Sequence, residues 1–335
     1  MRLKIILALL ITLFCASIKA QTVTPIQQNK PVSFRGLSVL DDKVAWVSGS
    51  KGTVGLTTDG GTNWTWQQVK GFEKSDFRDI EAFSDKEAVM IASGSPAYIL
   101  KTTDGGRHWE TKFQQTDSTY FLDAMDFANS KNGFVLGDPI NGKFLLLETD
   151  DAGDSWAPVK NAPAALKDEA AFAASGTCLR AEGFLAIVTG GSNSRMLMSP
   201  IGDMVWVNKA LPLTNGVASR GAFSVAFGKH QTIVVGGNYS KDKLPDSVAY
   251  VIPGAKAKFK NNTPVIGPAG YQSCVEYLKS NKFLSTGTPG TNLTADGGKT
   301  WVKIDGTSYN VCRKAKHGNL VLLAGDRGKL GIFKF

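Results

Sequence analysis

Short apolar and β-branched stretches alternate with glycine and polar residues along almost the whole chain. Pairs of such stretches recur, beginning at Val44, Ala88, Gly133, Phe184, Thr232, Lys282 and Leu320. Runs of this length with Gly or polar residues between them predict β-hairpins. A further β-rich stretch precedes each pair, beginning at Phe34, Phe77, Phe121, Gly176, Ala222, Tyr271 and Tyr309. The pattern therefore predicts an all-β chain built from seven similar units.

An eight-residue motif, Thr-x-Asp-x-Gly-x-x-Trp, follows four of the hairpins, at residues 57–64, 102–109, 149–156 and 294–301. In each copy we expect Asp to accept backbone N–H bonds, Gly to adopt a positive φ angle and Trp to pack over the turn. We interpret the motif residues as structural. They are Asp59, Gly61, Trp64, Asp104, Gly106, Trp109, Asp151, Gly153, Trp156, Asp296, Gly298 and Trp301.

The spacing of the motif indicates how the units are arranged. The 145 residues between Trp156 and Trp301 leave room for two degenerate copies, SPIGDMVW ending at Trp206 and the stretch from Tyr250 to Phe259. The seventh unit lacks an outer strand, which the segment from Gln21 to Ile26 could supply. Closure of this kind predicts a seven-bladed β-propeller of four-stranded antiparallel blades, in which radial repetition leaves only short strand edges.

The four motif copies are similar to Asp-boxes, and the chain resembles the BNR or Asp-box propellers. Within them it resembles the exported bacterial proteins that are similar to photosystem II assembly and stability factors. The resemblance covers residues 21–335 and implies a non-catalytic platform that binds a protein or glycan partner. Sialidases and other glycosidases share the box, so the resemblance leaves a sialidase-like glycoside hydrolase as the alternative.

The first twenty residues are typical of a signal peptide. Arg2 and Lys4 precede an apolar run of signal-peptide length, and Ala20 offers a small residue for cleavage before Gln21. The run is too short for a membrane span, although an uncleaved anchor is the alternative. We therefore expect residues 1–20 to be removed and residues 21–335 to form one soluble, monomeric domain in the periplasm or outside the cell.

The net charge and the absence of known motifs argue against several classes of function. Loss of Arg2, Lys4 and Lys19 lowers the net charge from +9 to +6, and the remaining basic residues are scattered, which argues against nucleic-acid binding. The sequence contains no G-x-S-x-G, no H-E-x-x-H, no phosphate-binding G-x-G-x-x-G after a strand and no Cys/His zinc cluster. We therefore expect neither a metal nor a cofactor.

Polar residues recur near the start of the innermost strands, which line the channel of a propeller. Superposition of the repeats places Arg35, Arg78, Gln272 and Asn310 at one position, with Arg220 nearby. Guanidinium groups hold carboxylates and other anions through forked hydrogen bonds, so this rim could anchor a ligand. The alternative is that these groups pair with one another. The candidate ligand-binding residues are Arg35, Arg78, Arg220, Gln272, Asn310 and Arg313.

The hydrolase alternative depends on carboxylates in the same region. Asp79 and Asp123 follow the rim position by one residue on neighbouring blades and are the candidate catalytic pair. A sialidase-like site would instead combine Arg35, Arg220 and Arg313 with Tyr271 or Tyr309. The Phe-Arg start of the sialidase pattern occurs at Phe34 but recurs at Phe77, which favours a feature of the repeat.

Deeper in the same strands, charged residues should be paired, because an unpaired buried charge is costly. We expect Asp126 to lie beside Arg180, and Glu276 beside Lys314. Cys178, Cys274 and Cys312 share one level of the channel. Of these, Cys274 and Cys312 could form a disulfide, or all three could be small buried apolar groups.

The stretch 157–175 is the longest without a strand pattern. Its alanines predict a short helix around Asp168 and Glu169. Such an insertion is usually a connection, and it would be a lid if it overhung the channel mouth.

Overall fold

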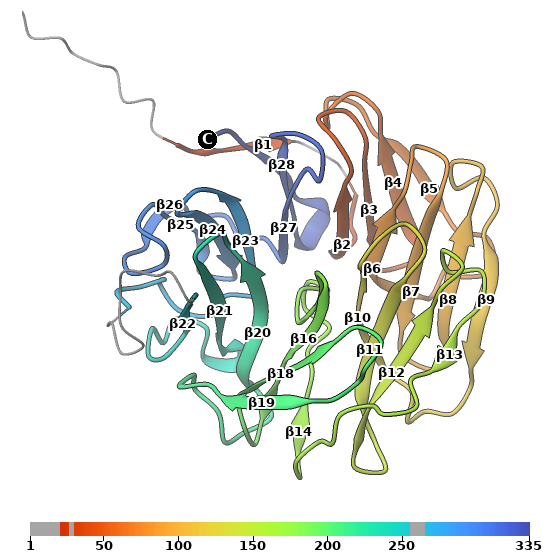
Figure 1. Ribbon diagram of the computed structural model, residues 1–335. Helices are drawn as coiled ribbons and strands as arrows, with labels where there is room; N and C mark the ends of the chain where they lie inside the picture. Colours follow the sequence, from red (N-terminus) through yellow and green to blue (C-terminus); the bar gives the residue numbers. More distant parts are fainter. Residues whose placement is uncertain (1–20, 27–29, 255–264) are drawn as a thin grey trace, which may run out of the picture.

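Seven antiparallel sheets stand around a central channel as the blades of a propeller (Figure 1). The computed structural model describes residues 21–26, 30–254 and 265–335. The predicted signal peptide, residues 1–20, lies outside the described residues. The seven-bladed fold predicted from the repeat is confirmed.

Blades 1 to 3 each follow the order of the chain, from the channel outwards. Blade 1 contains β2 (Phe34–Val39), β3 (Ala45–Gly49), β4 (Thr53–Thr57) and β5 (Thr65–Gln68). Blade 2 contains β6 (Asp76–Ala82), β7 (Ala88–Ser93), β8 (Ala97–Thr102) and β9 (Glu110–Gln115). Blade 3 contains β10 (Leu122–Phe127), β11 (Gly133–Ile140), β12 (Lys143–Thr149) and β13 (Ala157–Pro158).

Blades 4 and 5 are less regular. Blade 4 contains β15 (Leu179–Ala181), β16 (Phe184–Val188), β18 (Arg195–Pro200) and β19 (Val207–Ala210). Blade 5 contains β20 (Arg220–Phe227), β21 (Gln231–Asn238) and β22 (Ala249–Pro253), and the two-residue strands β14 (Glu169–Ala170) and β17 (Gly190–Gly191) join its inner side. The 3-10 turn η1 (Tyr239–Lys241) follows β21. The predicted degenerate box from Tyr250 to Phe259 lies partly outside the described residues.

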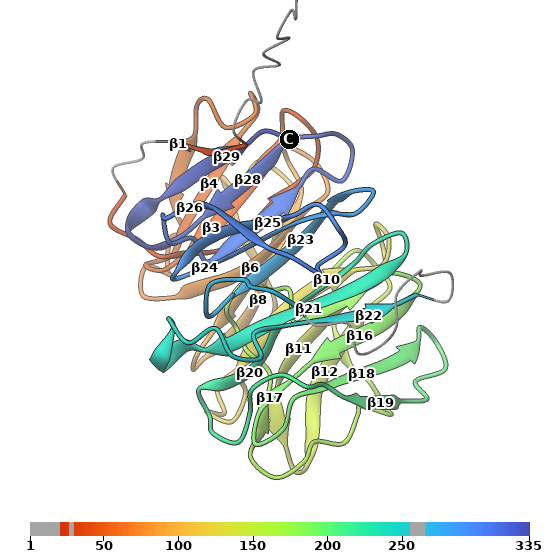
Figure 2. The same cartoon turned by 90° about the vertical axis from the view of Figure 1, so that its left-hand side faces the viewer.

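Blades 6 and 7 complete the ring. Blade 6 contains β23 (Cys274–Lys279), β24 (Lys282–Gly287), β25 (Gly290–Thr294) and β26 (Val302–Asp305). Blade 7 contains β27 (Val311–Lys314), β28 (Val321–Ala324), the 3-10 turn η2 (Asp326–Gly328) and β29 (Leu330–Phe333). The N-terminal strand β1 (Val23–Ile26) is its outer strand and pairs antiparallel with β29, with Val23 opposite Phe333 (Figure 2). The predicted closure of the ring by residues 21–26 is confirmed.

Each Asp-box holds the turn between the third and fourth strands of its blade. In blade 3, Thr149 Oγ1 donates to Asp151 Oδ1 at 2.7 Å and accepts from Gly153 N at 3.0 Å, while Trp156 Nε1 donates to Gly153 O at 3.2 Å. Gly153 has a φ of +84°, which a side chain rarely tolerates. The Thr149 hydroxyl thus forms two hydrogen bonds within the turn, and the Trp156 indole forms a third to the backbone of the turn.

The degenerate box of blade 4 keeps the hairpin without these bonds. Ser199 stands opposite Leu185, as the box threonines stand opposite the second strands of their blades, but its hydroxyl donates only to Pro200 O. Trp206 Nε1 turns away and donates to Asn161 O at 2.7 Å. This part of the prediction therefore holds for the strand pairing and fails for the turn chemistry, because Ile201 occupies the position of the box aspartate.

Candidate functional site

A β-bulge near the start of several innermost strands determines which side chains share a level of the channel. The pairing shifts between Phe34 and Gly36, between Phe77 and Asp79, and between Leu122 and Ala124. The bulged residues are therefore Arg35, Arg78 and Asp123. The superposition from sequence, which set Asp123 one residue later with Asp79, was wrong because it aligned Phe121 instead of Leu122 with Phe77.

The connection between blades 3 and 4 enters the channel itself. Residues 171–177, which we call the channel plug, are buried apart from the half-buried Phe172. Ser175 Oγ donates to Ser273 O at 2.7 Å, and Thr177 Oγ1 donates to Ser224 Oγ at 2.5 Å. The plug thus bonds to blades 5 and 6 from inside the ring. The predicted helix around Asp168 and Glu169 was wrong, because β14 and a turn occupy this place before the plug.

A buried carboxylate fastens the segment that leads into the plug. Glu169 on β14 accepts Arg195 Nη2 at 2.5 Å and Arg195 Nε at 2.8 Å, and it also accepts Thr189 Oγ1 at 2.6 Å. Its side chain is fully buried, so the forked contact with Arg195 satisfies a charge that would otherwise be costly. The plug is therefore a built part of the fold and not a loop that overhangs the mouth.

Two of the predicted rim residues are buried and form hydrogen bonds within the protein. Gln272 is fully buried, and its Oε1 accepts Ser285 Oγ at 2.8 Å and Asn292 Nδ2 at 3.2 Å. Asn310 is also buried and donates from Nδ2 to Phe34 O at 3.0 Å and to Asp326 Oδ1 at 2.9 Å. Both amides join strands and loops at the start of the innermost strands.

The predicted arginines divide between the two ends of the channel. Arg78 forms an ion pair with Asp76, Nε to Oδ2 at 2.8 Å, and donates from Nη1 to Ala173 O of the plug at 3.2 Å. Arg35 is half-buried, and Nε of the half-buried Arg220 has no hydrogen-bond partner within the described residues. Arg313 lies at the opposite end, so the structure does not assemble Arg35, Arg220 and Arg313 into one triad. Anion binding by the rim stays a prediction.

The candidate catalytic carboxylates lie beneath the plug. Asp79 is buried, and its carboxylate accepts Met125 N at 2.9 Å and Ile80 N at 3.0 Å. Burial raises the pKa of Asp79 to about 7, although Arg313 and the two backbone bonds oppose the shift. Burial and the nearby Asp138 also raise the pKa of Asp123, which is equally buried. A glycoside could not reach both carboxylates through the plug, so this placement gives the hydrolase alternative no support.

The other end of the channel is open. A cavity of about 840 Å³, which we call the channel funnel, is lined by residues 37–40, 81–83, 126–130, 180–182, 226–229, 276–278 and 313–317. Each of the seven blades contributes one of these segments, from the end of its innermost strand and the turn that follows. Asp79 and Asp123 do not line it. Its outer edge carries the exposed charges of Glu182 and Lys229, and the ammonium of Lys316 there forms an ion pair with the Glu81 carboxylate.

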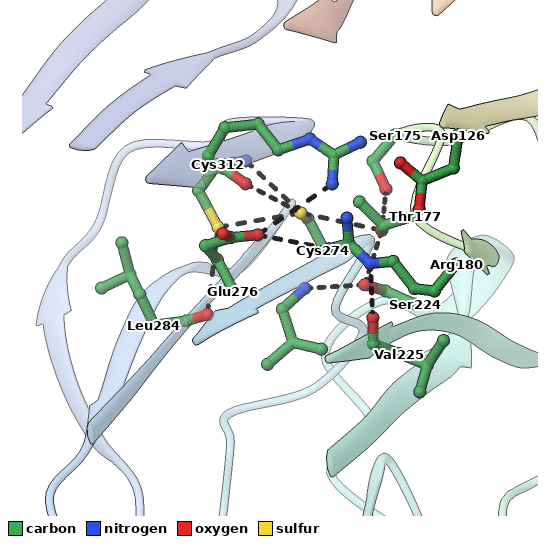
Figure 3. A network of polar contacts seen from close by, with 12 residues as sticks. Asp126, Ser175, Thr177, Arg180, Ser224, Val225, Cys274, Glu276, Leu284 and Cys312 are labelled. Atoms are coloured by element: carbon green, nitrogen blue, oxygen red, sulfur yellow. Dashed lines mark hydrogen bonds and ion pairs between the residues drawn. The ribbon is translucent and has the colours of Figure 1, made fainter. Parts of the chain in front are cut away.

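The floor of the funnel is an ionic network (Figure 3). Arg180 donates from Nη2 to Glu276 Oε2 at 3.2 Å and from Nε to Val225 O at 3.0 Å. Arg313 lies 4.0 Å from the same carboxylate and donates from Nε to Leu37 O at 3.3 Å. Burial opposes the charge of Arg180, but Glu276 and Asp126 raise its pKa overall.

Asp126 lies close enough to Arg180 to raise the pKa of that guanidinium, as predicted, but neither predicted ion pair, Asp126 with Arg180 or Glu276 with Lys314, occurs among the described residues. Asp126 Oδ2 accepts Ala181 N at 2.8 Å, and Lys314 Nζ donates to Gly318 O at 2.6 Å and to Ala315 O at 3.2 Å. Arg180 instead reaches Glu276 two blades away. The expectation that buried charges are satisfied holds, but adjacency of blades did not determine which groups meet.

Sequence reasoning missed the plug and the funnel edge. The plug had one signal, the buried-type composition AFAAS at residues 171–175 in a stretch with no strand pattern. The funnel edge had another, since charged residues recur just after the innermost strands at Glu182, Lys229 and Lys316. Among the residues that the structure describes, no group of three or more His, Cys, Asp or Glu side chains is placed to hold a metal ion. No helix in the described ranges is long and apolar enough to cross a membrane.

Comparison with known proteins agrees with the fold. Residues 65–169 match the family described as photosynthesis system II assembly factor YCF48. The structure of YCF48 bound to D1 peptide superposes with a TM-score of 0.63 at 14% identity and covers 94% of this chain and 97% of that chain. YCF48 from Cyanidioschyzon merolae gives 0.62 at 13% identity, covering 93% and 98%.

A propeller of another kind is also similar. The Pan2 WD40 domain of Neurospora crassa gives a TM-score of 0.62 at 13% identity and covers 91% of this chain and 89% of that chain. No curated protein matches the sequence. At these identities the structural likeness shows the fold alone. Together with the family match in blades 1 to 3, it confirms the resemblance of this chain to the BNR propellers of the photosystem II assembly factor type.

Proposed function

We propose that this chain is a non-catalytic binding protein that holds a segment of a partner protein at the channel funnel. The observation that carries the proposal is the difference between the two ends of the channel. The plug fills the end where the innermost strands begin, whereas all seven blades leave a cavity of about 840 Å³ at the end where they finish. A concave site with a few converging polar groups is the usual form of a ligand site.

The charges of the funnel suit a polar segment of a protein. Glu182 lies on one blade of the edge and Lys229 on another, so the edge offers both signs of charge, whereas Lys316 is already paired with Glu81. Complementary charges at an interface mainly determine which partner binds and how fast it associates. The volume would accept a few side chains of an extended peptide. A related fold is known in complex with a peptide, since one similar structure is YCF48 bound to D1 peptide.

Site-specific crosslinking tests the location. A photoreactive amino acid at Lys229 of the full chain should capture a protein from an extract of the producing cells. The same group at Lys74, an exposed residue in the loop before β6 at the plugged end, should not capture that protein. The triple variant of Arg35, Arg78 and Arg220 to Ala should retain capture from position 229. Capture of that protein from position 74 would place the partner at the plugged end and contradict the proposal. Loss of capture from position 229 on introducing the three arginine substitutions would contradict it in the same way.

We also propose that the protein acts after export. The support is the sequence of residues 1–20, with two basic residues before an apolar run and a small residue before Gln21. Mass spectrometry of the protein purified from the periplasm or medium should give a chain that begins at Gln21. A chain that stays in the cytoplasm and retains Met1 would contradict export.

A further inference from the structure

Two cysteines from neighbouring blades meet at the floor of the channel (Figure 3). Sγ of Cys312 lies 3.7 Å from Sγ of Cys274, and the backbone N of Cys312 lies 3.4 Å from the same Cys274 sulfur. Both side chains are fully buried and both are free thiols. Cys274 begins β23 of blade 6, and Cys312 lies in β27 of blade 7, which β1 completes.

The surroundings shift the pKa values of the two thiols in opposite directions. Burial alone would raise the pKa of Cys274, but the Cys312 thiol and the Arg313 guanidinium lower it. Burial raises the pKa of Cys312, and the neighbouring Cys274 adds to that increase. A thiolate next to a protonated thiol is the arrangement from which disulfide exchange proceeds, because the thiolate attacks and the second thiol resolves the mixed disulfide.

We propose that Cys274 and Cys312 form a structural disulfide between blades 6 and 7 when the chain folds in an oxidising compartment. This inference is independent of the partner-binding site. The oxidant is a disulfide of the glutathione class. One cysteine thiolate attacks a glutathione sulfur and releases one glutathione thiolate, and the second cysteine then attacks the mixed disulfide and releases the other. The protein loses two thiol protons and two electrons, and the two glutathione thiolates take up the protons.

The position of the pair gives the bond a structural consequence. The two residues are 38 positions apart in sequence, so the bond would close a loop that contains the rest of blade 6. It would also fix the innermost strand of blade 7, whose outer edge depends on pairing with the distant N-terminal strand β1. Since the folded protein buries both sulfurs, we expect oxidation to occur during folding, as blade 7 docks beside blade 6 and brings the two sulfurs together, and the bond to resist reduction afterwards.

The test compares two forms of one protein. The full chain with Cys15→Ser, which leaves the three described cysteines, is refolded with glutathione disulfide or with a reducing thiol. We expect one alkylatable thiol after oxidative refolding against three after reductive refolding. We further expect a linked peptide containing Cys274 and Cys312 and a higher midpoint of thermal unfolding. Cys178→Ser should still form the link, because Cys178 makes no sulfur contact with either residue within the described parts of the chain.

Three results would overturn the proposal. Three alkylatable thiols after oxidative refolding would show that the pair does not react. A linked peptide that contains Cys178 would show that the proximity of Cys274 and Cys312 does not direct the chemistry. An oxidised protein that unfolds at or below the midpoint of the reduced protein would show that the bond does not stabilise the ring. All three measurements use proteins in which Cys274 and Cys312 are unchanged. None of them depends on whether a serine variant at either position would fold.

Discussion

Nη2 of Arg180 lies 3.2 Å from Oε2 of Glu276, so a side chain of blade 4 meets a side chain of blade 6 across the channel. Both side chains are largely buried, with 11% and 16% of their surface exposed. The contact forms the floor of the open end and ties together two blades that do not touch through their sheets.

Arg180→Met should destabilise the fold by about 3 kcal/mol, because loss of one partner leaves the other charge buried. Arg313, at 4.0 Å, is too far to replace the hydrogen bond to Glu276. The free energy of unfolding in urea is the measurement. Lys70→Met, at an exposed position, is the control and should change the stability little. Equal stability of the two variants would show that the network is dispensable.

Gly176→Ala should loosen the channel plug. Gly176 has a φ of +71°, and a Cβ there would collide with the Asp79 carboxylate. Gly183 is the matched control, since its φ is +77° but a Cβ there would meet nothing within 4 Å. Gly183→Ala should cost about 1 kcal/mol through backbone strain alone, and Gly176→Ala should cost about 2 kcal/mol more through the collision. Equal losses would mean that the plug is not packed against Asp79.

Asp79→Asn should change how stability depends on pH. Because the pKa of Asp79 in the folded protein is about 7, the folded state keeps its proton while the unfolded state loses it from about pH 4 upwards. The wild type therefore loses stability between pH 4 and pH 7, and the loss stays constant above pH 7. Asn cannot ionise, so the stability of the variant relative to the wild type should increase over this range by up to about 4 kcal/mol.

The control for this titration is Asp117→Asn. Asp117 is exposed, and bonds from Thr119 lower its pKa. A carboxylate with a lowered pKa contributes stability that is present above its unfolded pKa and lost as the pH falls through its folded pKa, so the deficit of this variant relative to the wild type should develop below about pH 4 and stay constant above it. Denaturation curves at about pH 2, 4, 6 and 8 separate the two trends. A difference between Asp79→Asn and the wild type that does not vary with pH would contradict the burial argument.

Thr149→Val should cost about 2 kcal/mol, because it leaves Gly153 N buried without its acceptor and removes the bond to Asp151. Ser199→Ala changes the equivalent position of the degenerate box, where the hydroxyl donates only to Pro200 O. This variant should be close to neutral. Chemical unfolding of both variants compares a complete box with an incomplete one, and equal effects would mean that box chemistry does not stabilise the blade.

The repeated part of the fold could be read from the sequence because each blade carries the same local signals. A hairpin and a preceding strand recur seven times, the turn motif follows four of the hairpins, and the missing outer strand pointed to β1. The channel could not be read in the same way. Asp123 was placed one residue too late because Phe121 was aligned with Phe77 by its aromatic ring, and Arg180 reaches Glu276 two blades away, which the order of the blades does not predict. The plug is a single irregular connection, so no periodicity could reveal that it fills one end.

The most direct test of the account is the affinity of the crosslinked partner, once identified, for the full chain and two variants. If the partner docks at the channel funnel, reversal of two edge charges in Glu182→Lys with Lys229→Glu should weaken its Kd at least about tenfold, equivalent to about 1.4 kcal/mol. Lys74→Glu at the plugged end should leave the Kd unchanged. An unchanged Kd in the funnel variant together with a weakened Kd in Lys74→Glu would contradict the assignment of the open end as the binding site.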